Sequence, residues 1–458
     1  METNIIRSSF VQQGDTHDSE LQKSKVNSLG SESQEWLSRD ANAFLHQALS
    51  TPVMNVMKSA EGPYIYDLEG NQYLDLHGNG VHNVGYNNPE VISSIIHQLT
   101  DQLTFIPRRY TSIPTVRFAE RLIGLSPEGL DRVLFCPGGS EAIEMAVMLA
   151  KHVTGNWKTI SFWDQYHGNT MQAATLSGNE HFTNGMGPVV PGAFHVHYPN
   201  YYRNPWGLPS ENREALDELY LDEIRMIFKH HPDIAAVVGT TISSTPYVPS
   251  EYFWSEVRKL CDQHGTMLIF DEIVCGLGRT GRLFACEHYV TPDVVVMGKS
   301  LGGGILPFAG ILTKEEHNII DDYSIGHYTH EKSPICAAAG LTMLNYMEKH
   351  QLVANAENLG KYILEGFLKL QSQYEEIGKV DGKGMLISID LVKDRKSKLR
   401  NDVLASQVLG YCLDHGLSFK IIDGNVLALR PALIIDKSQA TQIIDTISSA
   451  LEHALKNQ

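Results

Sequence analysis

The sequence predicts an α/β fold in which a mostly parallel sheet is flanked by helices. Two short apolar runs, residues 267–270 and 294–297, have the length and composition of buried strands, and turn residues follow each of them. Asp271 comes directly after the first run, and Lys299 follows the second after one glycine. Because ligands bind at the carboxyl ends of the strands in open α/β sheets, these two side chains are predicted to share one crevice.

The N-terminal part is predicted to hold an arm and the first short strands. Residues 1–33 are polar and lack apolar periodicity, which predicts a flexible arm. Apolar spacing from residue 35 to about residue 49 predicts a helix, and two strands are expected on either side of the turn Glu69-Gly70-Asn71. Helical spacing returns at residues 91–103.

The middle and C-terminal parts alternate predicted strands with predicted helices. A strand at residues 132–136 leads through a glycine-rich turn into a helix that ends near residue 152. Residues 178–218 are rich in proline, glycine, tyrosine and asparagine, so they are expected to form a long loop beside the site. The other expected strands are 159–163, 234–238, 380–391 and 418–432, and the other expected helices are 219–230, one from about 337, 402–415 and one from 437 onward.

Composition argues against several classes of partner. The chain has 458 residues, of which 42% are hydrophobic, and this suffices for a sizeable core. A formal net charge of -16 argues against nucleic acid and against an anionic membrane surface. No apolar run reaches the roughly 18 residues that span a bilayer, and a signal-peptide pattern is lacking. The six cysteines have no metal-ligand spacing, so we expect no metal site and a cytoplasmic location.

The pair formed by Asp271 and Lys299 suits pyridoxal 5'-phosphate. This cofactor needs a lysine that forms a Schiff base with its aldehyde, and an acid that keeps its ring nitrogen protonated so that the ring withdraws electrons. Each residue alone has a simpler interpretation, because an aspartate after a strand commonly caps a turn and a lysine before glycines is commonly solvated. Their combination favours the cofactor.

Residues 266–307 resemble the class III (ornithine and omega) aminotransferase family of fold type I pyridoxal phosphate enzymes. The resemblance is carried by Asp271-Glu272-Ile273, by the Gly-x-Gly-Arg-Thr-Gly turn at 276–281, and by Lys299 with the glycines behind it. It implies a large domain with a seven-stranded, mostly parallel sheet flanked by helices, and a small α+β domain built from the N- and C-terminal segments. The expected divisions are 1–33 for the arm, 34–90 and 336–458 for the small domain, and 91–335 for the large cofactor-binding domain.

The same resemblance assigns roles around the cofactor. Lys299 is the expected Schiff-base lysine, and Asp271 is the expected partner of the ring nitrogen. The turn Gly138-Gly139-Ser140 is expected to bind the phosphate, since backbone N–H groups and the dipole at a helix N-terminus favour an anion. The other expected cofactor contacts are Tyr166, stacked on the ring, Ile273, and Thr329, which reaches the cofactor of the neighbouring subunit in a homodimer with shared active sites.

Arginines are the expected contacts to the substrate. Arg430 stands where the family binds the acidic group of its substrate, and a forked guanidinium suits a carboxylate or a phosphonate. Arg109, in the segment FIPRRYT, is a second candidate, although an ordinary surface ion pair explains it equally well. The same two interpretations apply to Lys332. His167 is interpreted as a hydrogen-bonded core histidine or, alternatively, as a catalytic one.

Two departures from the family pattern bear on the reaction. Thr240 stands where the family places a glutamate that masks the substrate-binding arginine, and Val274 stands where many members carry a glutamine beside the phenolic oxygen of the cofactor. The first departure and the available arginines at Arg430 and Arg109 favour a lyase, and the segments LHGNGVHNVGY, RRYT, STPY and HYTHEKSP resemble a lyase branch of the family.

The lyase resemblance implies a specific reaction. It is the loss of ammonia from (R)-1-hydroxy-2-aminoethylphosphonate, a small anionic amine, to give phosphonoacetaldehyde. The expected steps are Schiff-base formation, proton abstraction and β-elimination. The alternative is an omega-aminotransferase that passes the amino group to pyruvate or another keto acid.

Overall fold

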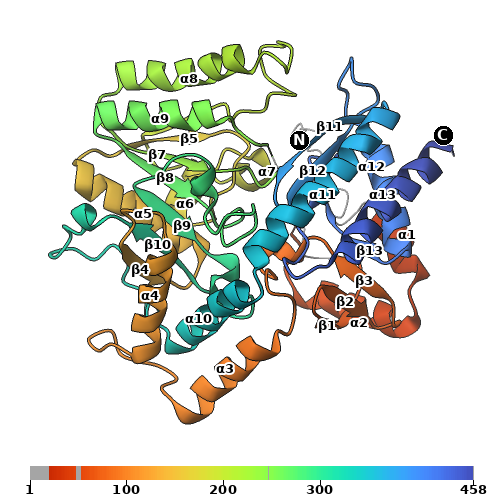
Figure 1. Ribbon diagram of the computed structural model, residues 1–458, viewed down its shortest axis with the longest axis horizontal. Helices are drawn as coiled ribbons and strands as arrows, with labels where there is room; N and C mark the ends of the chain where they lie inside the picture. The colour runs from red at the N-terminus through yellow and green to blue at the C-terminus, as the bar shows by residue number, and fades with distance from the viewer. Residues whose placement is uncertain (1–19, 48–52, 246, 457–458) are drawn as a thin grey trace, which may run out of the picture.

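The computed structural model of the protein describes residues 20–47, 53–245 and 247–456. A seven-stranded sheet, in the order β4-β10-β9-β8-β7-β5-β6, forms the centre of the larger part of the molecule (Figure 1). β10 (Ala309–Thr313) runs antiparallel to its neighbours β4 (Arg132–Cys136) and β9 (Val294–Met297), whereas the other neighbouring pairs are parallel. The predicted mostly parallel sheet is therefore confirmed.

Both faces of this sheet are buried. Along β8 (Met267–Asp271), Leu268 and Phe270 join one core cluster, in which Phe270 packs on Trp254 of helix α9 (Glu251–His264). Met267 and Ile269 join the other cluster, which contains the apolar face of helix α5 (Gly139–Thr154). Burial on both faces explains why the sequence shows continuous apolar runs rather than alternation. The remaining strands of the sheet are β5 (Lys158–Phe162), β6 (Ala193–Val196) and β7 (Ile234–Thr240).

Several helices around the sheet begin or end at recognisable capping residues. Asn88 caps α3 (Pro89–Asp101), because its side-chain oxygen accepts hydrogen bonds from two N–H groups of the first turn. Gly155 and Gly265 adopt the left-handed conformation that ends α5 and α9. The other helices of this part are α4 (Ile113–Leu125), α6 (Met171–Leu176), α7 (Glu180–Thr183), α8 (Arg213–His230) and α10 (Pro334–Lys349).

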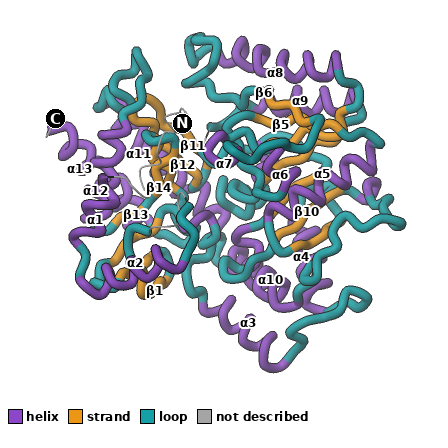
Figure 2. Tube along the Cα trace, turned by 180° about the vertical axis from the view of Figure 1, so that it is seen from behind, coloured by secondary structure: helices purple, strands orange, loops and turns teal. Residues whose placement is uncertain are grey.

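The smaller part of the molecule holds two four-stranded sheets, in the orders β1-β2-β3-β13 and β11-β12-β15-β14 (Figure 2). In the first, the parallel pairing of β3 with β13 joins N-terminal to C-terminal segments, as the fold class predicts. The strands are β1 (Met57–Glu61), β2 (Tyr64–Asp67), β3 (Gln72–Asp75), β11 (Ile377–Lys383), β12 (Leu386–Leu391), β13 (Leu417–Ser418), β14 (Lys420–Ile422) and β15 (Val426–Leu429). The helices are α1 (Glu20–Ser28), α2 (Ser31–Ala43), α11 (Leu352–Gln373), α12 (Asp402–Asp414) and α13 (Lys437–Lys456).

The N-terminal segment differs from its prediction as a flexible arm. Residues 1–19 of that arm lie outside the described residues, but residues 20–28 form α1 and residues 31–33 begin α2. Lys25 of α1 pairs with Asp414 at the end of α12. Helix α1 therefore contacts a residue that lies 389 positions away in the sequence, and local periodicity does not reveal such a contact.

Two further elements correct the sequence prediction. Strand β6 lies inside residues 178–218, which were expected to form a loop, because it pairs in parallel with β5 at the edge of the large sheet. Helix α8 begins at Arg213, earlier than the expected residue 219. Among the helices that the structure describes, none combines the length and the hydrophobicity needed to cross a bilayer.

Candidate functional site

A cavity of about 260 Å³ lies where β5, β7, β8 and β9 end. Asp271 and Lys299, the two side chains predicted to share one crevice, both line this strand-end cavity. The lining also includes Gly139, Ser140, Gln165, Tyr166, His167, Thr240, Ser244, Ile273 and Val274.

Lys299 is a half-buried residue at the wall of the strand-end cavity. It follows β9 and adopts a φ of 51°, in the left-handed region that a non-glycine residue occupies at an energetic cost and that is found repeatedly at functional sites. Burial is the main cause that lowers the pKa of its ammonium group to about 8; Arg430 adds to this effect and Asp271 opposes it. Nucleophilic attack on an aldehyde requires the neutral amine, and a lowered pKa increases the fraction of Lys299 in this form near neutral pH.

Asp271 is oriented by two hydrogen bonds. Nδ1 of His167 lies 2.7 Å from one carboxylate oxygen, and the backbone N–H of Ile273 donates to the other over 3.1 Å. The side chains of Asp271 and His167 are both buried. Of the two interpretations that the sequence left open for His167, the structure supports a histidine that positions the carboxylate.

The start of helix α5 offers an anion-binding surface. Gly138 is the N-cap residue, and no side chain caps the helix, so its first N–H groups are available to an anion. The Ser140 hydroxyl accepts a hydrogen bond from the backbone of Asn169 over 3.1 Å and keeps its own proton to donate. A Cβ atom on Gly139 would lie 2.8 Å from Cδ1 of Ile273, so a side chain there would crowd the cavity wall.

Tyr166 forms part of the cavity wall. Its ring is 42% exposed and packs against Phe182 of α7, with ring centroids 4.4 Å apart. Burial raises the pKa of its phenol, and the negative charge of Asp271 adds to this effect, which reflects their proximity. An exposed aromatic residue, a half-buried lysine, a carboxylate and an uncapped helix end together fit a flat, phosphorylated aromatic aldehyde.

Arg430 lies behind the cavity without a carboxylate partner in the part of the chain that the structure describes. It follows β15, is 5% exposed, and donates from Nη2 to the carbonyl of Ser244, which lines the cavity. Burial lowers the pKa of its guanidinium to about 10. Thr240 donates from its backbone N–H and its hydroxyl to Oε1 of Gln165, over 2.9 and 3.2 Å. Thr240 carries no charge, so it does not neutralise Arg430 as a glutamate at this position would. The charge of Arg430 is thus available to an anion.

Glu272 is a buried residue whose hydrogen-bond partners lie far from it in the sequence. Its carboxylate accepts hydrogen bonds from the backbone N–H groups of Ala285 and Cys286, both 2.6 Å long, and from the hydroxyl of Thr241. Burial nevertheless raises its pKa to about 7. The residue ties the end of β8 to the segments around residues 241 and 285. Its motif was recognised, but its partners are distant in sequence.

Arg109 and Thr329, which were expected to contact substrate and cofactor, lie away from the strand-end cavity of their own chain. Arg109 is exposed, and its guanidinium lies 5.3 Å from the ring of Tyr110. Thr329 is also exposed. The neighbouring Arg108 pairs with the buried Glu331 over 3.0 Å, so this arginine is engaged in a structural ion pair. The roles of Arg109 and Thr329 stay predictions.

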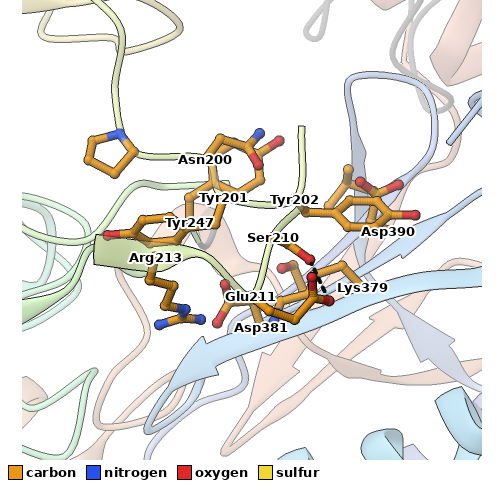
Figure 3. A pocket seen from close by; sticks show the side chains of 13 residues that line it. Asn200, Tyr201, Tyr202, Ser210, Glu211, Arg213, Tyr247, Lys379, Asp381 and Asp390 are labelled. Atoms are coloured by element: carbon orange, nitrogen blue, oxygen red, sulfur yellow. Dashed lines mark hydrogen bonds between the residues drawn. The ribbon is translucent and has the colours of Figure 1, made fainter. Parts of the chain in front are cut away.

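A second pocket, of about 220 Å³, lies between the segment 199–213 and the sheet that contains β11 and β12 (Figure 3). In this junction pocket the guanidinium of Arg213 lies 4.7 Å from the ring of Tyr201, and Ser210 donates to Glu211 over 3.1 Å. Asp390 accepts two hydrogen bonds from Arg203, each 2.8 Å long. No residue predicted to bind cofactor or substrate lines this pocket.

The comparisons with known proteins agree with the geometry of the strand-end cavity. Residues 46–451 match the aminotransferase class-III family. The chain belongs to the class III aminotransferase family. This membership confirms the predicted fold type I and the predicted cofactor, pyridoxal 5'-phosphate.

Relatives within this family differ in the reactions that they catalyse. An (R)-1-hydroxy-2-aminoethylphosphonate ammonia-lyase of Vibrio splendidus is 36% identical, over 98% of this chain and 96% of its own length. A leucine/methionine racemase of Thermococcus litoralis is 30% identical over 91% of this chain and 95% of its own. Family membership therefore establishes the cofactor and the fold, but members catalyse different reactions.

Solved structures of omega-transaminases match the fold closely. An (S)-enantioselective omega-transaminase from Thermomicrobium roseum has a TM-score of 0.85 and 27% identity, covering 92% of this chain and 99% of that one. The omega-transaminase from Pseudomonas jessenii in complex with PMP has a TM-score of 0.86 and 26% identity, covering 92% and 98%.

Proposed function

We propose that the protein is a pyridoxal phosphate-dependent ammonia-lyase that converts (R)-1-hydroxy-2-aminoethylphosphonate to phosphonoacetaldehyde and ammonia. The observation that carries this proposal is Arg430, a buried cation beside the cavity with no carboxylate partner among the described residues. Thr240, in place of an acid, binds Gln165 instead. A permanently available cation suits an enzyme whose only substrate is anionic, and the similarity to the Vibrio splendidus lyase supports the same choice.

The chain's own residues divide the work of binding and proton transfer. The uncapped start of α5 and Ser140 would hold the phosphate of the cofactor, Tyr166 would stack on its ring, and Asp271 would keep its ring nitrogen protonated. When bound, the cofactor withdraws electrons from the carbon that carries the substrate nitrogen. Lys299, freed when the substrate amine binds, removes a proton from that carbon. Arg430 holds the phosphonate and thereby orients this carbon toward the lysine.

The proposed reaction balances without an acceptor. The carbon bearing nitrogen loses a proton, and the neighbouring carbon loses its hydroxyl group, so one water molecule leaves. A water molecule then replaces the nitrogen, which departs as ammonia and leaves the aldehyde. No net oxidation or reduction takes place, so the reaction needs no keto acid.

The alternative is an omega-aminotransferase, which the class III transaminases among the solved structures favour. The two functions are separated by incubating the purified holoenzyme with the amino-alcohol phosphonate and no keto acid. The lyase yields phosphonoacetaldehyde, seen by phosphorus NMR, and ammonia in equal amounts. If no phosphonoacetaldehyde forms, and pyruvate is instead converted to alanine while the substrate becomes the aldehyde that keeps its hydroxyl group, the lyase proposal is wrong. Lys299→Ala provides the blank for both reactions.

A homodimer with shared active sites is part of this proposal. Large apolar side chains are exposed along α3, α4 and the segment between them, in the region that also contains Arg109. The exposed examples are Ile96, Leu99, Leu103, Phe105 and Ile113. Burial of this surface between two copies supports the placement of Thr329 at a partner's phosphate. Mixing inactive Lys299→Ala and Thr329→Ala chains is expected to restore activity in hybrid dimers that contain one intact site.

A further inference from the structure

The amide of Gln165 stands out among the buried polar groups of the strand-end cavity. Its Nε2 has no hydrogen-bond partner among the described residues, although the residue is 4% exposed. A buried donor without a partner is rare in folded proteins, because it loses its hydrogen bonds to water and gains none in return. The cavity that it lines is the one that contains Lys299 and Asp271. Such a donor points to an acceptor atom on a bound molecule.

The orientation of this amide is fixed. Oε1 accepts hydrogen bonds from the backbone N–H of Thr240 over 2.9 Å and from its hydroxyl over 3.2 Å. A backbone N–H can only donate, so the atom facing it must be the oxygen of the amide, and a flipped amide is excluded. Nε2 is consequently held as a rigid pair of donors.

The order of the strands indicates which acceptor this donor meets. β4, which leads to the phosphate-binding turn, lies on one side of β9 and β8, and β7, which ends at Thr240, lies on the other. In the cofactor, the phosphate arm and the phenolic oxygen are attached on opposite sides of the aldehyde carbon. With the phosphate at α5, the oxygen is directed toward the Thr240 side. Val274, which also lines the cavity, offers no side-chain donor there.

We propose that Gln165 is a cofactor-positioning residue whose Nε2 donates a hydrogen bond to the phenolic oxygen of pyridoxal phosphate. Thr240 then acts as the clamp that aims this amide. The donor stabilises the negative charge on the phenolic oxygen. Without the donor, this oxygen would attract more strongly the proton on the neighbouring nitrogen, which is the nitrogen that Lys299 contributes. This proposal needs the cofactor but not the lyase reaction, so it stands whether the enzyme is a lyase or an aminotransferase.

The test reads the chromophore of the holoenzyme before any substrate is added. Gln165→Leu removes the donor, so we expect the pH midpoint of the visible absorbance change to rise by about one unit. The Kd of the cofactor, measured by adding it back to the apoenzyme, is expected to rise about tenfold. Gln165→Glu keeps an acceptor for Thr240 but brings a carboxylate to the oxygen, so its midpoint is expected to rise further. The titratable groups that line the cavity are Tyr166, His167, Asp271 and Lys299, and they are unchanged in both variants.

The matched control is Gln371→Leu on α11, which also removes an amide donor, here one that bonds the carbonyl of Gly378 over 2.9 Å. It is expected to leave both the midpoint and the Kd unchanged. Wild-type values of both quantities in the two Gln165 variants would overturn the proposal. If only the KM for the amine rises, the acceptor belongs to the substrate and the proposal is wrong. If only the melting temperature falls, Gln165 is merely structural and the proposal is equally wrong.

Discussion

The strand-end cavity and the junction pocket are similar in size, at about 260 and 220 Å³, and both are lined by charged and aromatic side chains. In the junction pocket, Arg203 bonds Asp390 and the exposed Arg213 lies over a tyrosine ring, although the hydroxyl of Tyr202 is buried there without a partner among the described residues. In the strand-end cavity, Nε2 of Gln165 has no partner among the described residues, and Arg430 beside it has no carboxylate there.

This difference distinguishes a polar cluster that stabilises the fold from one that binds a ligand. A polar group whose hydrogen bonds are made inside the protein gains little from a further molecule. A group held rigid and unpaired gains a full hydrogen bond when a ligand arrives. Pocket size does not reveal this difference, whereas the burial and the pairing of the cations do: Arg430 is buried without a carboxylate partner among the described residues, and Arg213 is exposed. Substitutions in the two cavities should therefore have very different effects on catalysis.

The largest effect is expected for Lys299→Ala. The substitution removes the nucleophile and the base together, so kcat should fall by about 1000-fold or more. The visible chromophore that borohydride fixes in the native enzyme should also disappear. Steady-state kinetics and the absorbance spectrum measure the two losses. A variant that turned over amines at a normal rate would contradict the assignment of the strand-end cavity as the active site.

Asp271→Asn is expected to lower kcat by about 100-fold while leaving the fold intact. An amide cannot keep the ring nitrogen protonated as a carboxylate does. His167→Gln, which disturbs the 2.7 Å contact to Asp271 without touching the reacting atoms, should have a smaller effect in the same direction. Comparing kcat of the two variants with their circular dichroism separates chemistry from folding. Equal losses in both would show that His167 does more than position the acid.

Arg430→Ala should raise KM for the phosphonate substrate by about 30-fold and change kcat less. Removing the guanidinium takes away the anion contact, whereas Lys299 and Asp271 are unaffected. An amine without an anionic group serves as the control, since its KM should respond little. If KM for both amines changed equally, Arg430 would act on the structure of the cavity and not on the substrate anion.

The sequence predicted the chemistry of the site better than its internal contacts. Asp271 and Lys299 were identified because each follows a short apolar run and because the surrounding motif is distinctive. The contacts inside the site were not predicted, because the contacting residues lie far apart in the sequence. His167 and Asp271 are separated by 104 positions, and Gln165 and Thr240 by 75. No local pattern records such contacts. The antiparallel strand β10 was not predicted for the same reason, because its place between β9 and β4 depends on pairing with a strand that is distant in the sequence.

The recombination of apoenzyme with pyridoxal phosphate should depend on pH about tenfold between pH 7 and pH 9. The neutral amine of Lys299 is the reactive form, and burial lowers the pKa of its ammonium from 10.5 to about 8. The rate should therefore rise with pH through about 8 and then level off. An unburied lysine would give a rate that rises until about pH 10.5. Stopped-flow absorbance at fixed cofactor concentration distinguishes the two profiles.

The smallest effect is expected for Arg213→Ala in the junction pocket. The substitution removes a guanidinium that lies over the ring of Tyr201, a contact worth about 0.5–1 kcal/mol, so the melting temperature should fall by about 1–2 °C. Both kcat and KM should stay within about twofold of the native values, because no reacting group is touched. A large rise in KM would show instead that the junction pocket takes part in binding, and the contrast between the two cavities would no longer hold.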